Sequence, residues 1–529
     1  MVDDHRLNHP PRLFAWASAL VPVGATTVLV LVPSLVLALR ALSRSTIGNS
    51  LNLGRTAEIL FETTTQAAIS TALTLAIGLW PALVVARHQF PGRAWLLSFL
   101  TGIFVLPTVV MAAGVQATLP DRFDSGWVPI VIAHVVFNLA VVIRIVGAAP
   151  VPLDLEQTAR TLGASRAAVA RTVTLPLIAP AIAAAAAVVF VLAFTSYGVV
   201  RILGGMDAST LEVEIWRETM VFGRTDRGVS LAIVQVIVLS SFALIWMVAR
   251  RRLQPRTFTP GVPTGASPRA LISLIPVVLL LLVPLVALTV GSFRVDGEFR
   301  TSAWTSLGET SIRPGLDLGI DPTSALLTSA KIAVVATMIA VVIAVAVAVA
   351  MAADRRVGVV ADAAAMAPLA VSAVTIGLGI LITFDTSPFN WRASPLMVPL
   401  GHALVATPFV VRAGLAAMSS VPREQTDSAS TLGAGPAHAR LTALSPALIP
   451  ALTTGAGMAM AISLGEFGAT SLLSRSGAET LPIVIDRLLS RTGGDFRARG
   501  HALAVILTAA VMAATLGVER LVTRSRWWR

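Results

Sequence analysis

The chain has 529 residues, of which 55% are hydrophobic and only 13% charged, and its mean hydropathy is +0.80. A soluble globular protein is not this apolar, so the composition predicts an integral membrane protein. The net charge of +12 does not indicate nucleic-acid binding, because aromatic residues are only 6% and the arginines are scattered between long apolar runs. The absence of cysteine excludes disulfides, thiol catalysis and metal sites built on cysteine.

Apolar runs near the roughly 20 residues that cross a bilayer as a helix predict twelve spans. In the first half they are expected at about 13–39, 67–86, 94–116, 128–147, 177–195 and 229–249. In the second half they are expected at about 271–290, 332–353, 359–383, 397–417, 447–464 and 501–518. The first run is too long for a signal-peptide core and is expected to be a span.

A charged, proline-rich break divides the pattern into three parts: a first half of residues 1–250, a linker of residues 251–267 and a second half of residues 268–529. Arginines gather in the short loops of one side, and the positive-inside rule predicts that this side is cytoplasmic. We therefore expect a multi-pass protein of the cell (inner) membrane, surrounded by lipid, with both termini in the cytoplasm.

One stretch of the chain occurs twice. Residues 151–180 and 421–450 are related by a constant offset of 270 residues and share 11 identities in 30 aligned positions. Chance would give roughly two or three, so the pair indicates an internal duplication. We call residues 151–176 and 421–446 the first and the second elbow. Each elbow follows the fourth span of its half, which predicts a parallel repeat with a pathway between the halves.

The elbow sequence predicts a helix, a glycine turn and a second helix. In the first elbow, Gly163 is suited to the left-handed conformation that ends a helix, and Ser165 is a suitable N-cap for a short helix over 166–174. In the second elbow, Gly433 stops the first helix and Pro436 stands at the first position of the next. A rigid elbow held outside the membrane suits docking onto a partner.

The register of 270 residues extends beyond the elbows to two short segments that follow the fifth spans. Ser196-Tyr197-Gly198 aligns with Glu466-Phe467-Gly468, so the two segments are expected to face each other near the outer side. An acid near membrane depth is costly unless it is paired or wetted, which makes Glu466 a candidate for a translocation path. The alternative is a carboxylate at a helix end. The candidate path residues are Ser196, Tyr197, Glu466 and Phe467.

The spacing of alanine, glycine and proline in the elbows resembles the cytoplasmic coupling loop of ABC importer permeases. That pattern begins Glu-Ala-Ala, has glycine six residues after the glutamate and ends with a proline at the next span; this chain departs from it at the glutamate position, which holds Gln157 or Asp427. The resemblance implies coupling to an ATPase through Glu156, Gln157, Ala159, Gly163, Ala164, Pro176, Asp427, Ala429, Gly433, Ala434 and Pro446.

The same resemblance implies an all-α integral membrane fold of about twelve transmembrane helices in two homologous six-helix halves, the type I ABC importer permease fold. Fused permeases with two such loops resemble the ferric-iron and thiamine importers, and the segments around Tyr197 and Glu466 are more similar to the thiamine permeases. The expected cargo is thiamine or a related small cation, with ferric iron, polyamines or phosphonates as alternatives. The implied partners are two ATPase subunits and an extracytoplasmic binding protein.

Other classes of protein fit less well. The chain contains no G-x-x-x-x-G-K-[ST] loop, so we expect no cofactor in it and expect ATP and Mg²⁺ to be used by the partner ATPase. An ion-coupled secondary carrier would need membrane-embedded acids or histidines, and only Glu466, His134 and His402 stand out. No clustered carboxylates, H-E-x-x-H or nucleophile motif indicates an enzyme, and no metal site is expected.

Overall fold

The computed structural model describes residues 12–43, 52–205, 208–252, 264–309, 311–313, 316–317, 321–385, 394–433, 436–475 and 478–525. Within them, ten helices are long and apolar enough to cross a membrane, and two bent helix pairs raise the number to as many as twelve if each pair is one span. The predicted all-α membrane fold is confirmed.

The straight spans follow the predicted order in both halves. In the first half they are α1 (Arg12–Thr26), which continues through η1 (Thr27–Leu31) into α2 (Val32–Ser43), then α4 (Leu53–Arg87), α7 (Trp127–Gly147), α10 (Leu175–Phe194) and α13 (Thr225–Arg252). In the second half they are α14 (Pro268–Ile272) with α15 (Ile275–Gly291), α17 (Pro322–Ala353), α20 (Met397–Ser419), α22 (Pro436–Gly465) and α25 (Gly494–Ser525).

The third span of each half is broken, which corrects the straight spans predicted at 94–116 and 359–383. The first pair is α5 (Arg93–Val105) and α6 (Thr108–Thr118), bent by 99°; the second is α18 (Arg355–Met366), η5 (Ala367–Ala370) and α19 (Ala373–Phe384), bent by 98°. Proline explains the first break, because Pro107 has no N–H to donate and Leu106 before it is extended, with ψ 140°. In the second break, Pro368 lies in η5 and Ser372 caps α19.

The first helix of each half packs against the other half. Helix α1 lies against α17 and α18, and the Thr26 hydroxyl donates to the Ala364 carbonyl at 2.7 Å. Reciprocally, α15 packs against α6 of the first half. The two halves expected from the sequence are therefore not separate packing units. Of the expected linker, residues 253–263 lie outside the described residues; beyond them β2 (Thr264–Gly265) pairs in parallel with β1 (His88–Gln89).

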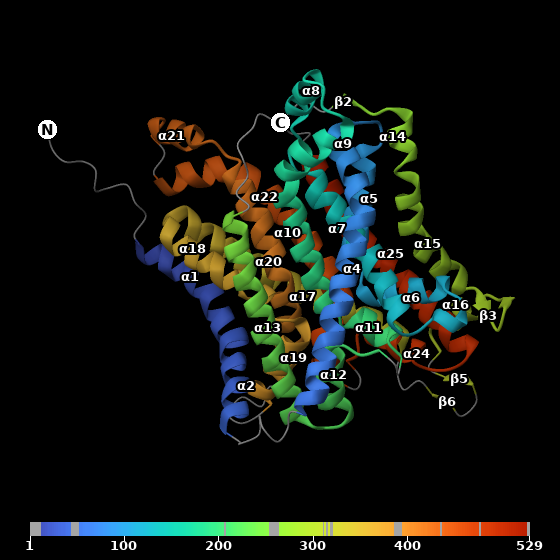
Figure 1. The fold of residues 1–529 in the computed structure, drawn as a ribbon. Helices are drawn as coiled ribbons and strands as arrows, with labels where there is room; N and C mark the ends of the chain where they lie inside the picture. Colours follow the sequence, from blue (N-terminus) through green and yellow to red (C-terminus); the bar gives the residue numbers. More distant parts are fainter. Residues whose placement is uncertain are drawn as a thin grey trace.

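Short elements connect the spans at the two ends of the bundle. The elbows contain α8 (Leu153–Thr161), α9 (Arg166–Val169), η3 (Ala170–Thr174) and α21 (Arg423–Thr431). The other connections contain η2 (Asp121–Phe123), α11 (Gly198–Leu203), α12 (Leu211–Trp216), η4 (Arg217–Val221), α16 (Ser302–Thr305), α23 (Gly468–Leu473), α24 (Leu481–Leu489) and the antiparallel pairs β3 (Arg294–Val295) with β4 (Glu298–Phe299) and β5 (Ser311–Arg313) with β6 (Leu316–Asp317). Figure 1 shows α8 and α21 at one end of the bundle and α12, α24, β5 and β6 toward the other.

The core joins both halves and fixes the short helices. One cluster of buried apolar side chains includes Leu139 and Leu211 of the first half together with Leu481 and Leu503 of the second. The duplicated Thr-Leu pairs begin α12 and α24, and each leucine N–H donates to a span hydroxyl: Leu211 to Thr63 Oγ1 at 3.1 Å and Leu481 to Ser329 Oγ at 2.8 Å. These bonds satisfy helix-start donors that would otherwise be buried without partners.

Candidate functional site

The first elbow has the predicted helix, glycine turn and N-cap. Gly163 has φ +87°; its N–H donates to the Arg160 carbonyl at 2.9 Å, and the Ala164 N–H donates to the Ala159 carbonyl at 3.0 Å. These two bonds form the Schellman ending, in which the left-handed residue is usually glycine. Ser165 Oγ then accepts from the Ala168 N–H at 3.2 Å and starts the next helix. The turn is thus dictated by local sequence.

The second elbow repeats this geometry. Helix α21 ends before Gly433, which has φ +89° and donates its N–H to the Ser430 carbonyl at 3.0 Å. Ala434 lies outside the described residues, and α22 begins at Pro436, as the sequence predicts. Both elbows therefore turn through a glycine in the same left-handed conformation.

The second arm of the first elbow does not end at about residue 174 as the sequence predicts. In the first half, helical structure runs without interruption from Arg166 to Phe194, and in the second α22 runs from Pro436 to Gly465. Pro176 and Pro446 lie inside these continuous helices rather than at a return into the membrane. The second arm of each elbow is consequently continuous with the fifth span of its half.

The residues expected to couple to an ATPase have different exposures. Glu156 is buried: its Oε1 accepts from Arg87 Nη2 at 2.6 Å and from Thr174 Oγ1 at 2.5 Å. Ala159, Ala164 and Ala429 are half-buried, whereas Gln157, Gly163, Pro176, Asp427, Gly433 and Pro446 are exposed. Glu156 therefore braces the first elbow from within, and the exposed positions form the surface that a partner would meet.

Two leucines on this surface were missed by the sequence reasoning. Leu162 is 83% exposed and Leu432 is 89% exposed, each directly before the turn glycine. A single exposed leucine is ordinary on a protein surface, but here a leucine is exposed at the equivalent place of both elbows. Their identity between the two copies of the repeat is a signal that could have identified them.

A cavity of about 730 Å³ lies between the halves, on the side opposite the elbows. Its lining comes from both copies of the segments after the fifth span: Tyr197, Arg201, Trp216 and Met220 from the first half, and Phe467, Ser471, Ser474, Arg475, Ile483, Asp486 and Arg487 from the second. Two of the four expected path residues, Tyr197 and Phe467, are among them, and Ser196 and Glu466 are not.

Aromatic rings and one buried ion pair dominate one side of this cavity. The rings of Tyr197 and Phe467, which are equivalent in the repeat, lie 5.0 Å apart between centroids, as expected for segments that face each other. The Arg201 guanidinium carbon lies 4.5 Å from the centroid of the Trp216 ring, and Arg201 Nη2 lies 3.3 Å from Asp486 Oδ2. Asp486 is in α24, outside the candidate spans; burial raises the pKa of its carboxyl, and the nearby Arg201 charge acts in the opposite direction.

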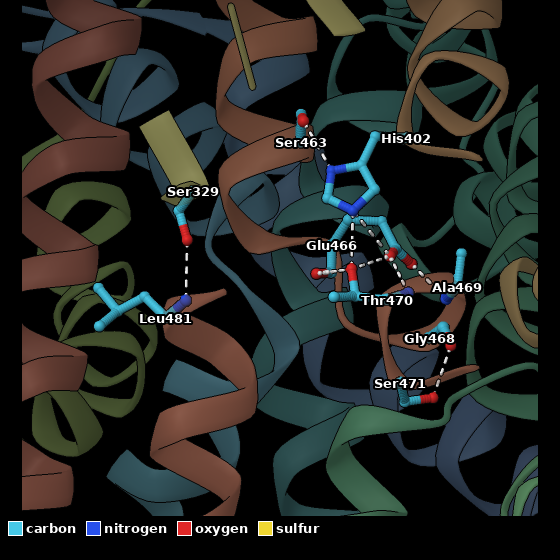
Figure 2. Close-up of polar contacts among 9 residues, drawn as sticks. All are labelled: Ser329, His402, Ser463, Glu466, Gly468, Ala469, Thr470, Ser471 and Leu481. Atoms are coloured by element: carbon cyan, nitrogen blue, oxygen red, sulfur yellow. Dashed lines mark hydrogen bonds and ion pairs between the residues drawn. The ribbon is translucent and has the colours of Figure 1, made fainter. Parts of the chain in front are cut away.

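Figure 2 shows why Glu466 is not part of the cavity lining. Its carboxylate accepts from the N–H groups of Ala469 and Thr470, each at 3.1 Å, and from Thr470 Oγ1 at 3.0 Å. His402 Nε2 lies 3.5 Å from the same carboxylate, while His402 Nδ1 and Ser463 Oγ are 2.8 Å apart. Glu466 thus caps α23, where the helix dipole favours a negative charge. This is the helix-end alternative considered from the sequence.

The geometry consists of two matched elbows at one end of the bundle and an inter-half cavity toward the other. Residues 74–259 match the protein family described as "Binding-protein-dependent transport system inner membrane component". Residues 74–259 of the chain are a permease domain of this transport family. Permeases of this type are multi-pass inner-membrane proteins of ABC importers, which work with an ATPase and a substrate-binding protein.

The similarity to known permeases also covers the second half of the chain. The chain is 28% identical over 463 residues to the thiamine transport system permease protein ThiP of Brucella suis, covering 82% of each chain. It is 25% identical over 473 residues to ThiP of Salmonella typhimurium, covering 84% of each chain. It is also 31% identical over 160 residues to the putative 2-aminoethylphosphonate transport system permease protein PhnV of Salmonella typhimurium, covering 30% of this chain and 58% of that protein.

Proposed function

We propose that this permease forms the membrane path of an ATP-driven thiamine importer. The observation that carries the proposal is similarity over 82–84% of both chains to two permeases described as thiamine transporters, combined with an elbow in each half. A likeness that covers both halves is informative because the inter-half cavity needs residues from each. The permease itself catalyses no reaction in this proposal.

ATP hydrolysis is assigned to two separate ATPase subunits, one beneath each elbow, which bind ATP and Mg²⁺. The exposed elbow residues, with Leu162 and Leu432 at their tips, provide the docking surfaces. Because each elbow is continuous with a fifth span, closure of the ATPase pair would move α10 and α22 and open or close the cavity. The arginines of the elbow side support a cytoplasmic location for the elbows and both termini.

Cargo is delivered by an extracytoplasmic binding protein to the cavity at the opposite face. Tyr197 and Phe467 would contact it there, whereas Ser196 and Glu466 lie outside the cavity lining, and Glu466 caps α23. Lipid surrounds the spans, and nucleic acid has no role in this function.

A second candidate cargo is a phosphonate. The observation that favours it is the presence of three arginines, Arg201, Arg475 and Arg487, in the cavity lining, since guanidinium groups pair well with phosphonate oxygens. The 31% identity to a putative 2-aminoethylphosphonate permease over 160 residues agrees with this alternative.

Uptake separates the candidates. Labelled thiamine, 2-aminoethylphosphonate and chelated ferric iron are offered to cells with and without this chain. If cells without the chain lose only thiamine uptake, the proposal is supported. If they lose phosphonate or iron uptake instead, that compound is the cargo. If they lose none of the three, the thiamine assignment is wrong. Purification of the tagged permease then tests coupling. A co-purifying ATPase is expected, and uptake driven by a proton gradient without any ATPase would contradict the importer mechanism.

A further inference from the structure

The cavity between the halves already holds a positive charge that belongs to the chain. The Arg201 guanidinium lies over the Trp216 ring, 4.5 Å from its centroid, and 3.3 Å from Asp486. Tyr197 lies between two other aromatic rings: its ring centroid is 6.2 Å from that of Trp216 and 5.0 Å from that of Phe467. An aromatic face and a carboxylate both attract cations, so this arrangement is a cation-binding site with a side chain as its occupant.

The site is built from equivalent positions of the two halves. Tyr197 and Phe467 are partners in the repeat, and so are Trp216 and Asp486, which lie 270 residues apart. The first half therefore supplies the aromatic face, and the second half supplies the carboxylate at the corresponding place. A relative movement of the halves changes the distance between these two groups and with it the strength of the site.

The burial of the two charged groups is unequal. The Arg201 side chain is 24% exposed and the Asp486 side chain is 10% exposed. A long arginine at the wall of an open cavity has room to leave, whereas the carboxylate stays in place. Because a buried carboxylate without a partner is costly, the departure of Arg201 requires another cation to take its position.

We propose that Arg201 is a built-in substitute for the positive charge of the cargo, and that a planar organic monocation displaces it to bind between Trp216 and Asp486. This inference rests on the proposed function, because it assumes that the cavity lies on the import path. A guanidinium is planar and delocalised, and a thiazolium ring likewise carries one delocalised positive charge in a plane.

The test is equilibrium binding of labelled thiamine to the purified permease–ATPase complex without the binding protein, with labelled choline as a second cation. Asp486→Asn and Trp216→Leu should each weaken binding by about tenfold, since they remove the carboxylate and the aromatic face. Arg201→Gln should strengthen binding severalfold, because it removes the competitor. A salt bridge that only holds the halves together would shift binding in the same direction when either partner is changed.

Two further variants separate the site from general charge effects and from misfolding. Arg487→Gln removes a positive charge from the same cavity. Arg487 pairs with Glu479 at 3.4 Å rather than with Trp216 or Asp486, so cation binding should change by less than about twofold. Trp216→Phe keeps an aromatic face and should restore most of the binding lost in Trp216→Leu.

Weaker binding in Arg201→Gln, or equal strengthening in Arg201→Gln and Arg487→Gln, overturns the proposal. So does a failure of Arg201→Gln to bind either cation at millimolar concentration. If wild-type cells do not import thiamine but cation binding still depends on Asp486 and Trp216, the proposed function fails and the cation site stands. If thiamine is imported but cation binding is unchanged in the Asp486 and Trp216 variants, only the cation site is wrong.

Discussion

The two elbows share one turn but are fastened to the bundle differently. In the first elbow, the buried Glu156 carboxylate joins Arg87 at the end of α4 to Thr174 on the second arm. The equivalent position in the second elbow is Thr426, and among the residues described there Arg440 Nη1 donates to the Ala352 carbonyl at 2.7 Å. The turn follows from duplicated residues, whereas the fastening follows from residues that differ. If both elbows dock an ATPase as proposed, these different fastenings predict unequal stiffness of the two contacts.

The largest expected effect comes from the feature that the elbows share. Gly163→Val and Gly433→Val place a β-branched residue at φ +87° and +89°, where a left-handed conformation costs about 1–2 kcal/mol. A Cβ at either position meets no atom within 4 Å, so the effect acts through the backbone alone. We expect uptake to fall at least tenfold in each variant with unchanged amounts of permease in the membrane. Asparagine at the same positions is the matched control and should retain most uptake.

Uptake at the wild-type level in both valine variants would contradict the coupling role of the elbows. A loss in only one variant would sharpen the comparison, because it would mean that one elbow alone limits transport.

The next effect concerns what a partner meets at the elbow tips. Leu162→Ala and Leu432→Ala remove apolar side chains that are 83% and 89% exposed. We expect each to lower the amount of co-purifying ATPase by about fivefold, without a change in the melting temperature of the isolated permease. Retention of the ATPase by the double variant would remove both leucines from the docking surface.

A smaller effect should distinguish the two fastenings. Glu156→Gln leaves Arg87 without its ionic partner and should reduce uptake about threefold, since a charged hydrogen bond with a buried group contributes on the order of 1.5–3 kcal/mol before the part exposure of Arg87 is taken into account. Glu424→Gln, at an exposed position in the first turn of the second elbow, is the matched control and should change uptake little. Equal losses in the two variants would show that the buried carboxylate has no special role.

The smallest effect is expected from Arg440→Met, which removes the bond to the Ala352 carbonyl. A single charged donor to a carbonyl should be worth less than a carboxylate with two donors, so uptake should fall less than twofold. Combining Arg440→Met with Glu156→Gln in a double-mutant cycle measures whether the elbows act independently. A loss from Arg440→Met larger than that from Glu156→Gln would reverse the assigned order of stiffness.

The local features of this permease were largely predictable because they depend on residues close in sequence. Hydropathy located the spans, and the repeat located both glycine turns together with the Ser165 cap of the first elbow. The breaks in the third spans also had a local signal in Pro107 and Pro368, which an interpretation based on apolar run length alone passes over. The length of the second elbow arm was underestimated, since Pro176 and Pro446 do not interrupt their helices.

The sequence by itself predicted a duplicated membrane chain with an elbow in each half, because helix length, glycine conformation and capping are short-range properties. Only the tertiary structure decided that α1 and α15 pack on the opposite halves and that Arg201 of the first half meets Asp486 of the second. In a bilayer, apolar spans have no strong solvent-driven preference among neighbours, so close packing and polar pairing select the partners. The packing of α1 on α17 and the Arg201–Asp486 pair join residues far apart in the sequence, which no local pattern records.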